Sequence, residues 1–192
     1  MSALSNPARL MVRPFRVYAE LAVAREGGGG PTAAVGAARF LFVFGAFVSL
    51  TATGRLAPSE LLSGILSFAY VPIVHAVALG VATRSVAREV RLGRAFALYA
   101  EGYGPWFLMM LLVAGSSLFA PAPAELLAAT APLLGLAAMS WSGVLTFACF
   151  RSGLGLSRRR AATATALHYV IIIGLYVGYF LAAGQLLPIL PR

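Results

Sequence analysis

The sequence has few charged residues and no lysine. Charged residues make up 11% of its 192 residues, whereas a soluble domain carries about a quarter. Hydrophobic residues make up 60% of the chain, and the mean hydropathy is +0.86. This composition excludes an ordinary soluble domain and indicates an integral membrane protein.

The sequence also has little cysteine and lacks the common catalytic and metal-binding motifs. Cys149 is the only cysteine, which excludes an intrachain disulfide and a cysteine cluster for a metal. We expect it to be a small residue in helix packing. There is no nucleophile with a base and an orienting group, and no helix carries paired metal ligands. The glycine run at Gly27–Gly30 lacks the lysine and threonine of a nucleotide-binding loop. We therefore predict that the protein is not an enzyme and binds no cofactor and no metal.

All basic residues are arginines, and the net charge is +9. The arginines cluster in the gaps between apolar runs, which favours a role in membrane orientation over nucleic-acid binding. Anionic lipid headgroups are the expected counter-charges. The absence of lysine and the abundance of alanine and arginine suggest a GC-rich bacterial genome. We therefore expect a multi-pass protein of a bacterial inner membrane.

Five apolar runs are long enough to cross a membrane, which takes about 20 residues. Pro72 is expected to kink the second run, and Gly102, Gly104 and Pro105 are expected to break the third. The predicted fold class is all-α, with residues 32–192 forming a five-helix transmembrane domain. The predicted spans cover about 32–54, 61–83, 95–120, 125–150 and 163–187.

Residues 1–31 are predicted to form a cytoplasmic amphipathic helix and a glycine-rich linker. Phe15, Tyr18 and Leu21 recur at helical spacing opposite Arg16 and Glu20. Arginines interrupt the apolar core that a signal peptide needs, so we do not expect one here.

A second interfacial helix is predicted between spans two and three. Arg84, Arg88 and Arg91 recur at helical spacing and share one face, with Arg94 beside it. We interpret these residues and the loop residues Arg158, Arg159 and Arg160 as topology signals and lipid contacts, with a docking surface for a cytoplasmic partner as the alternative.

The distribution of arginines over the short loops predicts an N-in, C-out orientation. In this orientation the outer side carries only Arg55 and Arg192. The inner side carries Arg9, Arg13, Arg16, Arg25, Arg39, Arg84, Arg88, Arg91, Arg94, Arg151, Arg158, Arg159 and Arg160.

Three ionisable residues lie inside the apolar runs. His75, Glu101 and His168 are seven to nine positions from the arginines that mark the inner helix ends, or about 10 to 14 Å along a helix. Ionisable residues at this depth usually face the bundle interior. We consider a buried cluster in which Glu101 pairs with a histidine, and alternatively separate positions in which only His75 bonds a neighbouring carbonyl.

The last run contains a GxxxG pattern at Gly174 and Gly178. Small residues four apart allow another helix to approach closely. We expect contact with a neighbouring helix of the same bundle, and the alternative is a dimer face.

Three stretches in order resemble the Yip-domain family, whose eukaryotic members are named for interacting with Ypt/Rab GTPases. The resemblance implies a five-helix membrane fold, and the family offers no agreed catalytic residues to carry over. The stretches are Arg13–Phe15; Leu92–Phe96 leading to Gly102–Pro105; and Trp141 and Leu145 followed by Arg151 and Gly155–Arg158.

We therefore expect a non-enzymatic membrane protein that binds or organises lipid or protein partners, including a possible homo-oligomer. Two alternatives stay open. One is a transport or channel component that uses His75, Glu101 and His168, and the other is an accessory subunit of a larger membrane complex.

Overall fold

The computed structural model describes residues 7–26, 33–119 and 124–186, and the chain forms helices without strands in these ranges. The predicted glycine-rich linker and residues 120–123 lie outside the described residues. The elements are α1 (Pro7–Val12), α2 (Pro14–Glu26), α3 (Ala33–Thr53), α4 (Pro58–Ser67), α5 (Tyr70–Val86), α6 (Leu92–Ala100), η1 (Glu101–Tyr103), α7 (Gly104–Phe119), α8 (Ala124–Ala148), η2 (Cys149–Gly153) and α9 (Arg158–Leu186).

Within the described part of the chain, five stretches are long and apolar enough to cross a membrane, which confirms the predicted five-span fold. The last span begins earlier than expected, because Arg158–Arg160 form the first turn of α9 instead of a loop. Ser157 precedes this turn and accepts a hydrogen bond from the backbone N–H of Arg160, at 3.4 Å. The five stretches are Ala34–Thr53, Pro58–Val86, Leu92–Ser116, Pro132–Gly153 and Arg158–Tyr179.

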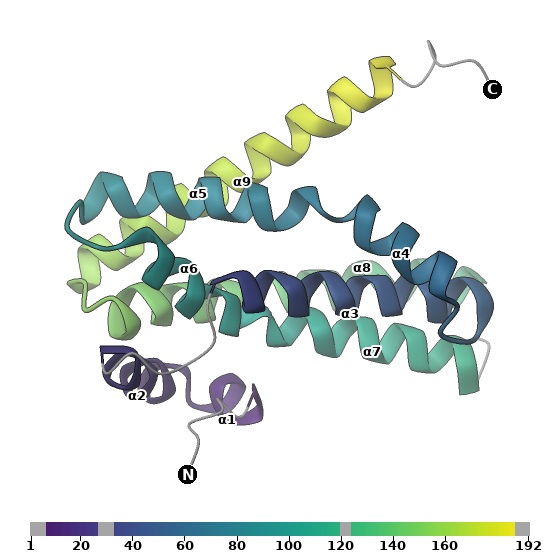
Figure 1. The fold of residues 1–192 in the computed structure, drawn as a ribbon, viewed down its shortest axis with the longest axis horizontal. Helices are drawn as coiled ribbons and strands as arrows, with labels where there is room; N and C mark the ends of the chain where they lie inside the picture. The colour runs from purple at the N-terminus through teal and green to yellow at the C-terminus, as the bar shows by residue number, and fades with distance from the viewer. Residues whose placement is uncertain (1–6, 27–32, 120–123, 187–192) are drawn as a thin grey trace.

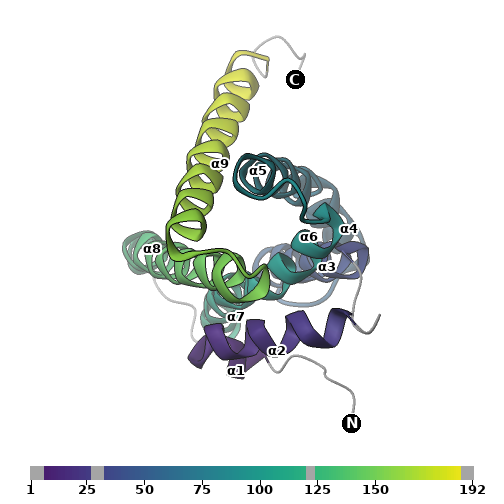
Figure 2. The same cartoon turned by 90° about the vertical axis from the view of Figure 1, so that its left-hand side faces the viewer.

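The membrane helices surround a central space, and α1 and α2 lie outside them at one end (Figures 1 and 2). Tyr18 and Leu21 of α2 are buried against the bundle, as the predicted apolar face requires. The deepest packing is at this end, where Tyr18 meets Leu98 of α6 and Phe150 of η2 in one core cluster. The predicted interfacial helix therefore packs on protein through its apolar face.

The second span consists of two helices, and Pro72 explains the break between them. A proline ring clashes with the carbonyl four residues before it, which here belongs to Phe68. The two helices are separated at Phe68 and Ala69, and the backbone of Phe68 leaves the helical region. The predicted kink is present, and it turns the Phe68 side chain towards the bundle core.

The predicted interfacial helix across Arg84–Arg94 is wrong. The α5 helix ends at Val86, and residues 87–91 form a turn before α6 begins at Leu92. Because α5 and α6 contact each other, the chain must reverse direction within this short segment. Arg84 donates a hydrogen bond from Nη1 to the backbone oxygen of Arg88 at 2.9 Å, so it satisfies a carbonyl of the turn. Ala87 is buried, which fixes the turn against the core.

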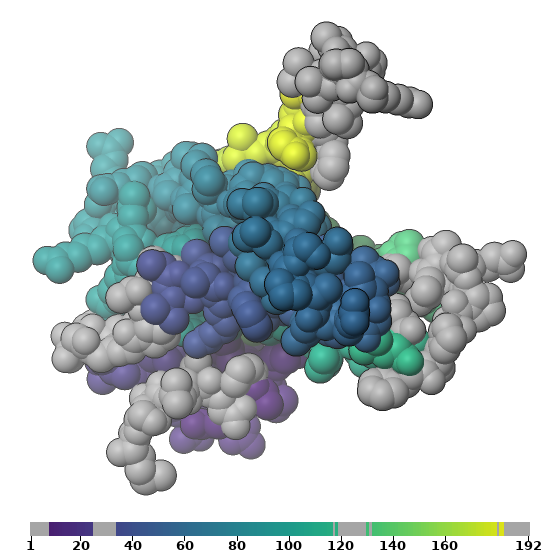
Figure 3. Space-filling view, turned by 45° about the vertical axis from the view of Figure 1, so that its right-hand side comes forward, coloured from purple at the N-terminus to yellow at the C-terminus, as the bar shows by residue number. Residues whose placement is uncertain are grey.

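Close backbone packing joins α3 and α4, which lie against each other on the face shown in Figure 3. A Cβ atom added to Gly45 would lie 2.6 Å from the backbone oxygen of Leu61 and 2.8 Å from Cγ1 of Ile65. At the connecting loop, Ser49 donates from Oγ to the backbone oxygen of Arg55 and accepts from the N–H of Ala57. Small residues and one buried hydroxyl therefore hold this helical hairpin.

Replacing Gly45 by alanine should destabilise the fold. The new methyl group meets the α4 backbone, which cannot move aside like a flexible side chain, so we expect a loss of about 1–3 kcal/mol. Thermal unfolding in one detergent, followed by circular dichroism, would measure it. Gly174→Ala is the matched control, because a Cβ atom there meets nothing within 4 Å. Equal melting temperatures for the two variants would contradict the prediction.

Candidate functional site

Three helices bring His75, Tyr99 and His168 together in the middle of the bundle. The Nδ1 atom of His75 on α5 is 2.7 Å from the hydroxyl of Tyr99 on α6. The Nε2 atom of His168 on α9 is 3.0 Å from the same hydroxyl. Two members of the cluster that the sequence analysis considered therefore lie together, and they are bridged by a tyrosine that it did not select.

Tyr176 extends this hydrogen-bonded chain towards α9. Its hydroxyl is 3.4 Å from Nε2 of His75. Tyr99 has one hydroxyl proton, so it donates to one histidine and accepts from the other. If Tyr99 donates to His75, then Nε2 of His75 carries a proton and donates to Tyr176. In the opposite direction Tyr176 donates to His75. Tyr176 therefore forms one end of this hydrogen-bonded chain, and His168 forms the other.

Glu101 does not join the histidines in the way the cluster hypothesis proposed. Its Oε2 atom lies 3.6 Å from Nη1 of Arg39 on α3, and its side chain is buried while that of Arg39 is half-exposed. Successive helical residues are about 100° apart, so Glu101 points away from Tyr99, two positions earlier. Among the described residues, no group of three or more His, Cys, Asp or Glu side chains is placed to hold a metal ion.

A cavity of about 540 Å³ lies beside the histidines, and residues from α3 to α9 line it. More than half of its lining residues are aromatic, and none is arginine or glutamate. The lining comprises Phe40, Phe44, Phe68, Tyr70, Val71, His75, Tyr99, Tyr103, Trp106, Met139, Ser142, Tyr169, Ile172, Ile173, Tyr176 and Val177.

The cavity has a buried floor and an exposed rim. Tyr103 on the floor is 2% exposed, and Tyr99 beside it is also buried. On the other side, Met139 of α8 is 39% exposed, Ile173 of α9 is 49% and Val177 is 52%. Residues that line the cavity and are also exposed mark its opening. The mouth therefore lies between α8 and α9.

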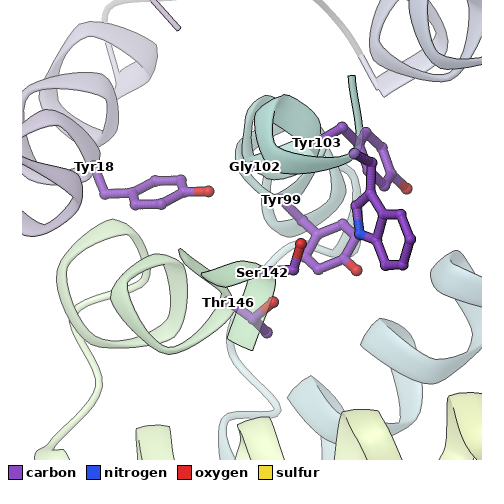
Figure 4. A pocket seen from close by; sticks show the side chains of 7 residues that line it. Tyr18, Tyr99, Gly102, Tyr103, Ser142 and Thr146 are labelled. Carbon is purple, nitrogen blue, oxygen red and sulfur yellow. The ribbon is translucent and has the colours of Figure 1, made fainter. Parts of the chain in front are cut away.

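The predicted helix break is present as the 3-10 turn η1, and it admits a side chain from α2. Figure 4 shows Tyr18 reaching from α2 towards Gly102 and Ser142. A Cβ atom on Gly102 would lie 2.8 Å from the Tyr18 hydroxyl, so only glycine leaves room for this tyrosine. A recess of about 10 Å³ remains here, bounded also by Thr146, and it shares Tyr103 with the large cavity.

The GxxxG residues do not pack as expected. A Cβ atom on Gly174 or Gly178 would have nothing within 4 Å among the described residues. Among the described side chains of α9, the buried ones are Ala161, Ala164, His168 and Ile172, and Ile172 lies six residues before Gly178. Beyond them α9 rises away from α3, α7 and α8 (Figure 1). The expected contact inside the bundle is therefore wrong.

The predicted basic residues gather at the end of the bundle that carries α2. Arg84 is in the last turn of α5, Arg91 precedes α6, and Arg158–Arg160 begin α9. Arg94 donates to the backbone oxygen of Ala22 at 3.4 Å, which links α6 to α2. Arg151 donates to the backbone oxygen of Leu156 at 2.8 Å and shapes the turn before α9.

Sequence reasoning missed Tyr99 and Tyr103, the hydroxyl-bearing residues of the floor. The sequence analysis considered only ionisable residues and therefore selected Glu101, which lies between Tyr99 and Tyr103 in the sequence but on another face of the helix. The available signal was the spacing of the two tyrosines, since residues four apart share a helical face. This spacing places both on the side opposite Glu101, where they contact His75.

Removing the Tyr99 hydroxyl should destabilise the protein more than removing that of Tyr176. Tyr99→Phe leaves nitrogen atoms of two histidines without their partner, and each unsatisfied buried group costs about 1–3 kcal/mol. Tyr176→Phe is the matched control, because it removes one longer contact. Thermal unfolding in detergent compares the two, and a smaller loss for Tyr99→Phe would refute the bridging role.

Comparison with protein-family models matches residues 8–181 to the Yip1 domain. No curated protein and no solved structure matches the chain. The match covers all five spans in part or in full, and it confirms the resemblance seen in the sequence motifs. The chain therefore belongs to the Yip1-domain family of multi-pass membrane proteins.

Proposed function

We propose that the protein is a non-enzymatic membrane protein that binds a lipid in its central cavity. The observation that carries this proposal is an aromatic cavity whose mouth opens sideways between two membrane spans, α8 and α9. Its volume of about 540 Å³ is within the range of roughly 300–1,000 Å³ for small-molecule sites.

The position of the mouth favours a ligand from the bilayer. Met139 is 12 residues from Arg151, and Ile173 is 15 residues from Arg158. At 1.5 Å per residue, the mouth lies about 18–22 Å along the helices from the arginine-rich end. The hydrocarbon core is about 30 Å thick, so this depth is inside it. A molecule that enters here must already be dissolved in lipid.

The lining favours binding over transport. Transport through the histidines needs a water-filled polar path, and the cavity walls are mostly aromatic and aliphatic. Glu101, the expected carboxylate of such a path, pairs with Arg39 on α3. The apolar walls and the few hydroxyl groups at the floor match an amphiphile better than an ion.

We further propose the N-in, C-out orientation in a bacterial inner membrane, with the arginine-rich end on anionic headgroups. The described arginines of this end surround α2 and the helix ends beside it. The opposite end carries Arg55, just after α3. Positive charge on the cytoplasmic side is the usual arrangement.

A reporter fused to the C-terminus should test this orientation. Alkaline phosphatase, which needs an oxidising compartment, should be active there, and a green fluorescent protein in the same place should stay dark. Fusions at the N-terminus are the matched control and should give the reverse result. A fluorescent C-terminal fusion would overturn the proposed orientation.

Narrowing the cavity mouth should release the lipid. Ile173→Trp places a larger ring at the mouth, and native mass spectrometry from mild detergent counts the lipids that stay bound. We expect at least a severalfold loss of the bound lipid. Val170→Trp is the matched control on the same helix, because Val170 is exposed and outside the lining.

Both variants should elute as the wild type does from size exclusion, since both positions are exposed. Equal lipid retention in Ile173→Trp and Val170→Trp would contradict binding in this cavity.

A further inference from the structure

Two buried hydroxyl groups in the cavity lining have no hydrogen-bond partner within the described part of the chain. They are Oγ of Ser142 on α8 and the hydroxyl of Tyr103 in η1. Ser142 is 9% exposed and Tyr103 is 2% exposed. Buried polar groups in native proteins are normally satisfied by protein, water or ligand. These two hydroxyls therefore point to a partner that occupies the cavity floor.

The residues that carry the two hydroxyls define a polar corner of the cavity, in which the hydroxyls point in different directions (Figure 4). Tyr103 and Ser142 line both the large cavity and the small recess beside Tyr18. The recess, at about 10 Å³, is at the lower limit for one water molecule. It is too small for a lipid headgroup, so a ligand must reach these hydroxyls from the large cavity.

The corner offers hydrogen bonds and no fixed charge. Neither arginine nor glutamate lines the cavity. Both nitrogen atoms of His75 already have partners, Tyr99 and Tyr176. A phosphate or ammonium group here would be buried without a counter-charge, which is strongly unfavourable.

The depth of the corner also excludes a headgroup that stays in water. Tyr103 is nine residues from Arg94, and Ser142 is nine residues from Arg151. Both are thus about 14 Å along their helices from the arginine-rich end. A small uncharged polar group can enter the hydrocarbon to this depth, because a few hydrogen bonds satisfy it.

We infer that the lipid is uncharged and that Ser142 and Tyr103 each bond one of its polar oxygens at the cavity floor, as in a diacylglycerol, which carries a hydroxyl and two carbonyl groups. This inference rests on the proposed lipid binding and deepens it. The aromatic walls hold the hydrocarbon chain, which leaves through the mouth between α8 and α9. The two hydroxyls select the polar group.

Fluorescence of Trp106, which lines both the cavity and the recess, provides the test. Trp141→Phe leaves Trp106 as the only tryptophan. The full chain in detergent is titrated with diacylglycerol carrying dibrominated acyl chains, which quench a nearby tryptophan. Phosphatidylglycerol with the same chains is the comparison. We expect diacylglycerol to quench Trp106 at concentrations severalfold lower than phosphatidylglycerol.

Removing the two hydroxyls should abolish this preference. Ser142→Ala and Tyr103→Phe should each weaken quenching by diacylglycerol roughly three- to tenfold, as expected for one hydrogen bond. Ser116→Ala and Tyr179→Phe are the matched controls outside the lining and should leave it unchanged. Without lipid, Ser142→Ala should melt no lower than the parent, since it removes a hydroxyl that lacks a partner.

The possible failures are distinguishable. If both brominated lipids quench equally and the hydroxyl variants change nothing, the inference of an uncharged lipid is wrong, and water alone satisfies the corner. Binding of a lipid chain in the cavity would then still stand. If neither lipid quenches Trp106, both the inference and the proposed function are wrong.

Discussion

The hydroxyl of Tyr99 is the polar contact on which the arrangement of the central helices depends. It lies between nitrogen atoms of His75 and His168, and so joins α5, α6 and α9 at one point. In hydrocarbon no water replaces a lost hydrogen bond, so each polar group must find its partner within the protein. Apolar contacts between membrane helices compete with equally apolar lipid. The bridge therefore specifies which faces of these helices meet.

The short 3-10 turn η1 allows one span to serve several contacts. Tyr103 lines the cavity beside Tyr99, and its ring contacts the Tyr99 ring. Glu101 forms an ion pair with Arg39 of α3. Gly102 gives Tyr18 of α2 room to approach. A larger residue at this position would meet the Tyr18 hydroxyl and force it to shift. Three consecutive residues of η1 thus make three different contacts: Glu101 with α3, Gly102 with α2, and Tyr103 with the cavity.

The sequence predicted the spans well, because long apolar runs and their flanking arginines are local signals. Pro72 likewise predicted a break near Phe68, since the clash it causes is fixed by covalent geometry. The turn at residues 87–91 was missed because helical spacing of arginines does not reveal that α5 and α6 must lie side by side. The partner of Glu101 and the open face at Gly174 were missed for the same reason. Which face of a membrane helix meets protein depends on the other helices, and an apolar residue suits both protein and lipid.

The departure of α9 from the bundle has a consequence for the cavity. Its outer half has exposed residues at Val177 and Leu181, and in a bilayer this exposure costs little because lipid is as apolar as a protein interior. The mouth beside it therefore opens to hydrocarbon, and hydrocarbon chains can fill the space without specific attraction. Selection among lipids must then come from the few polar atoms at the floor. A buried hydroxyl without a partner is unfavourable, so a lipid that satisfies Ser142 and Tyr103 gains an advantage that chain length or saturation alone cannot supply.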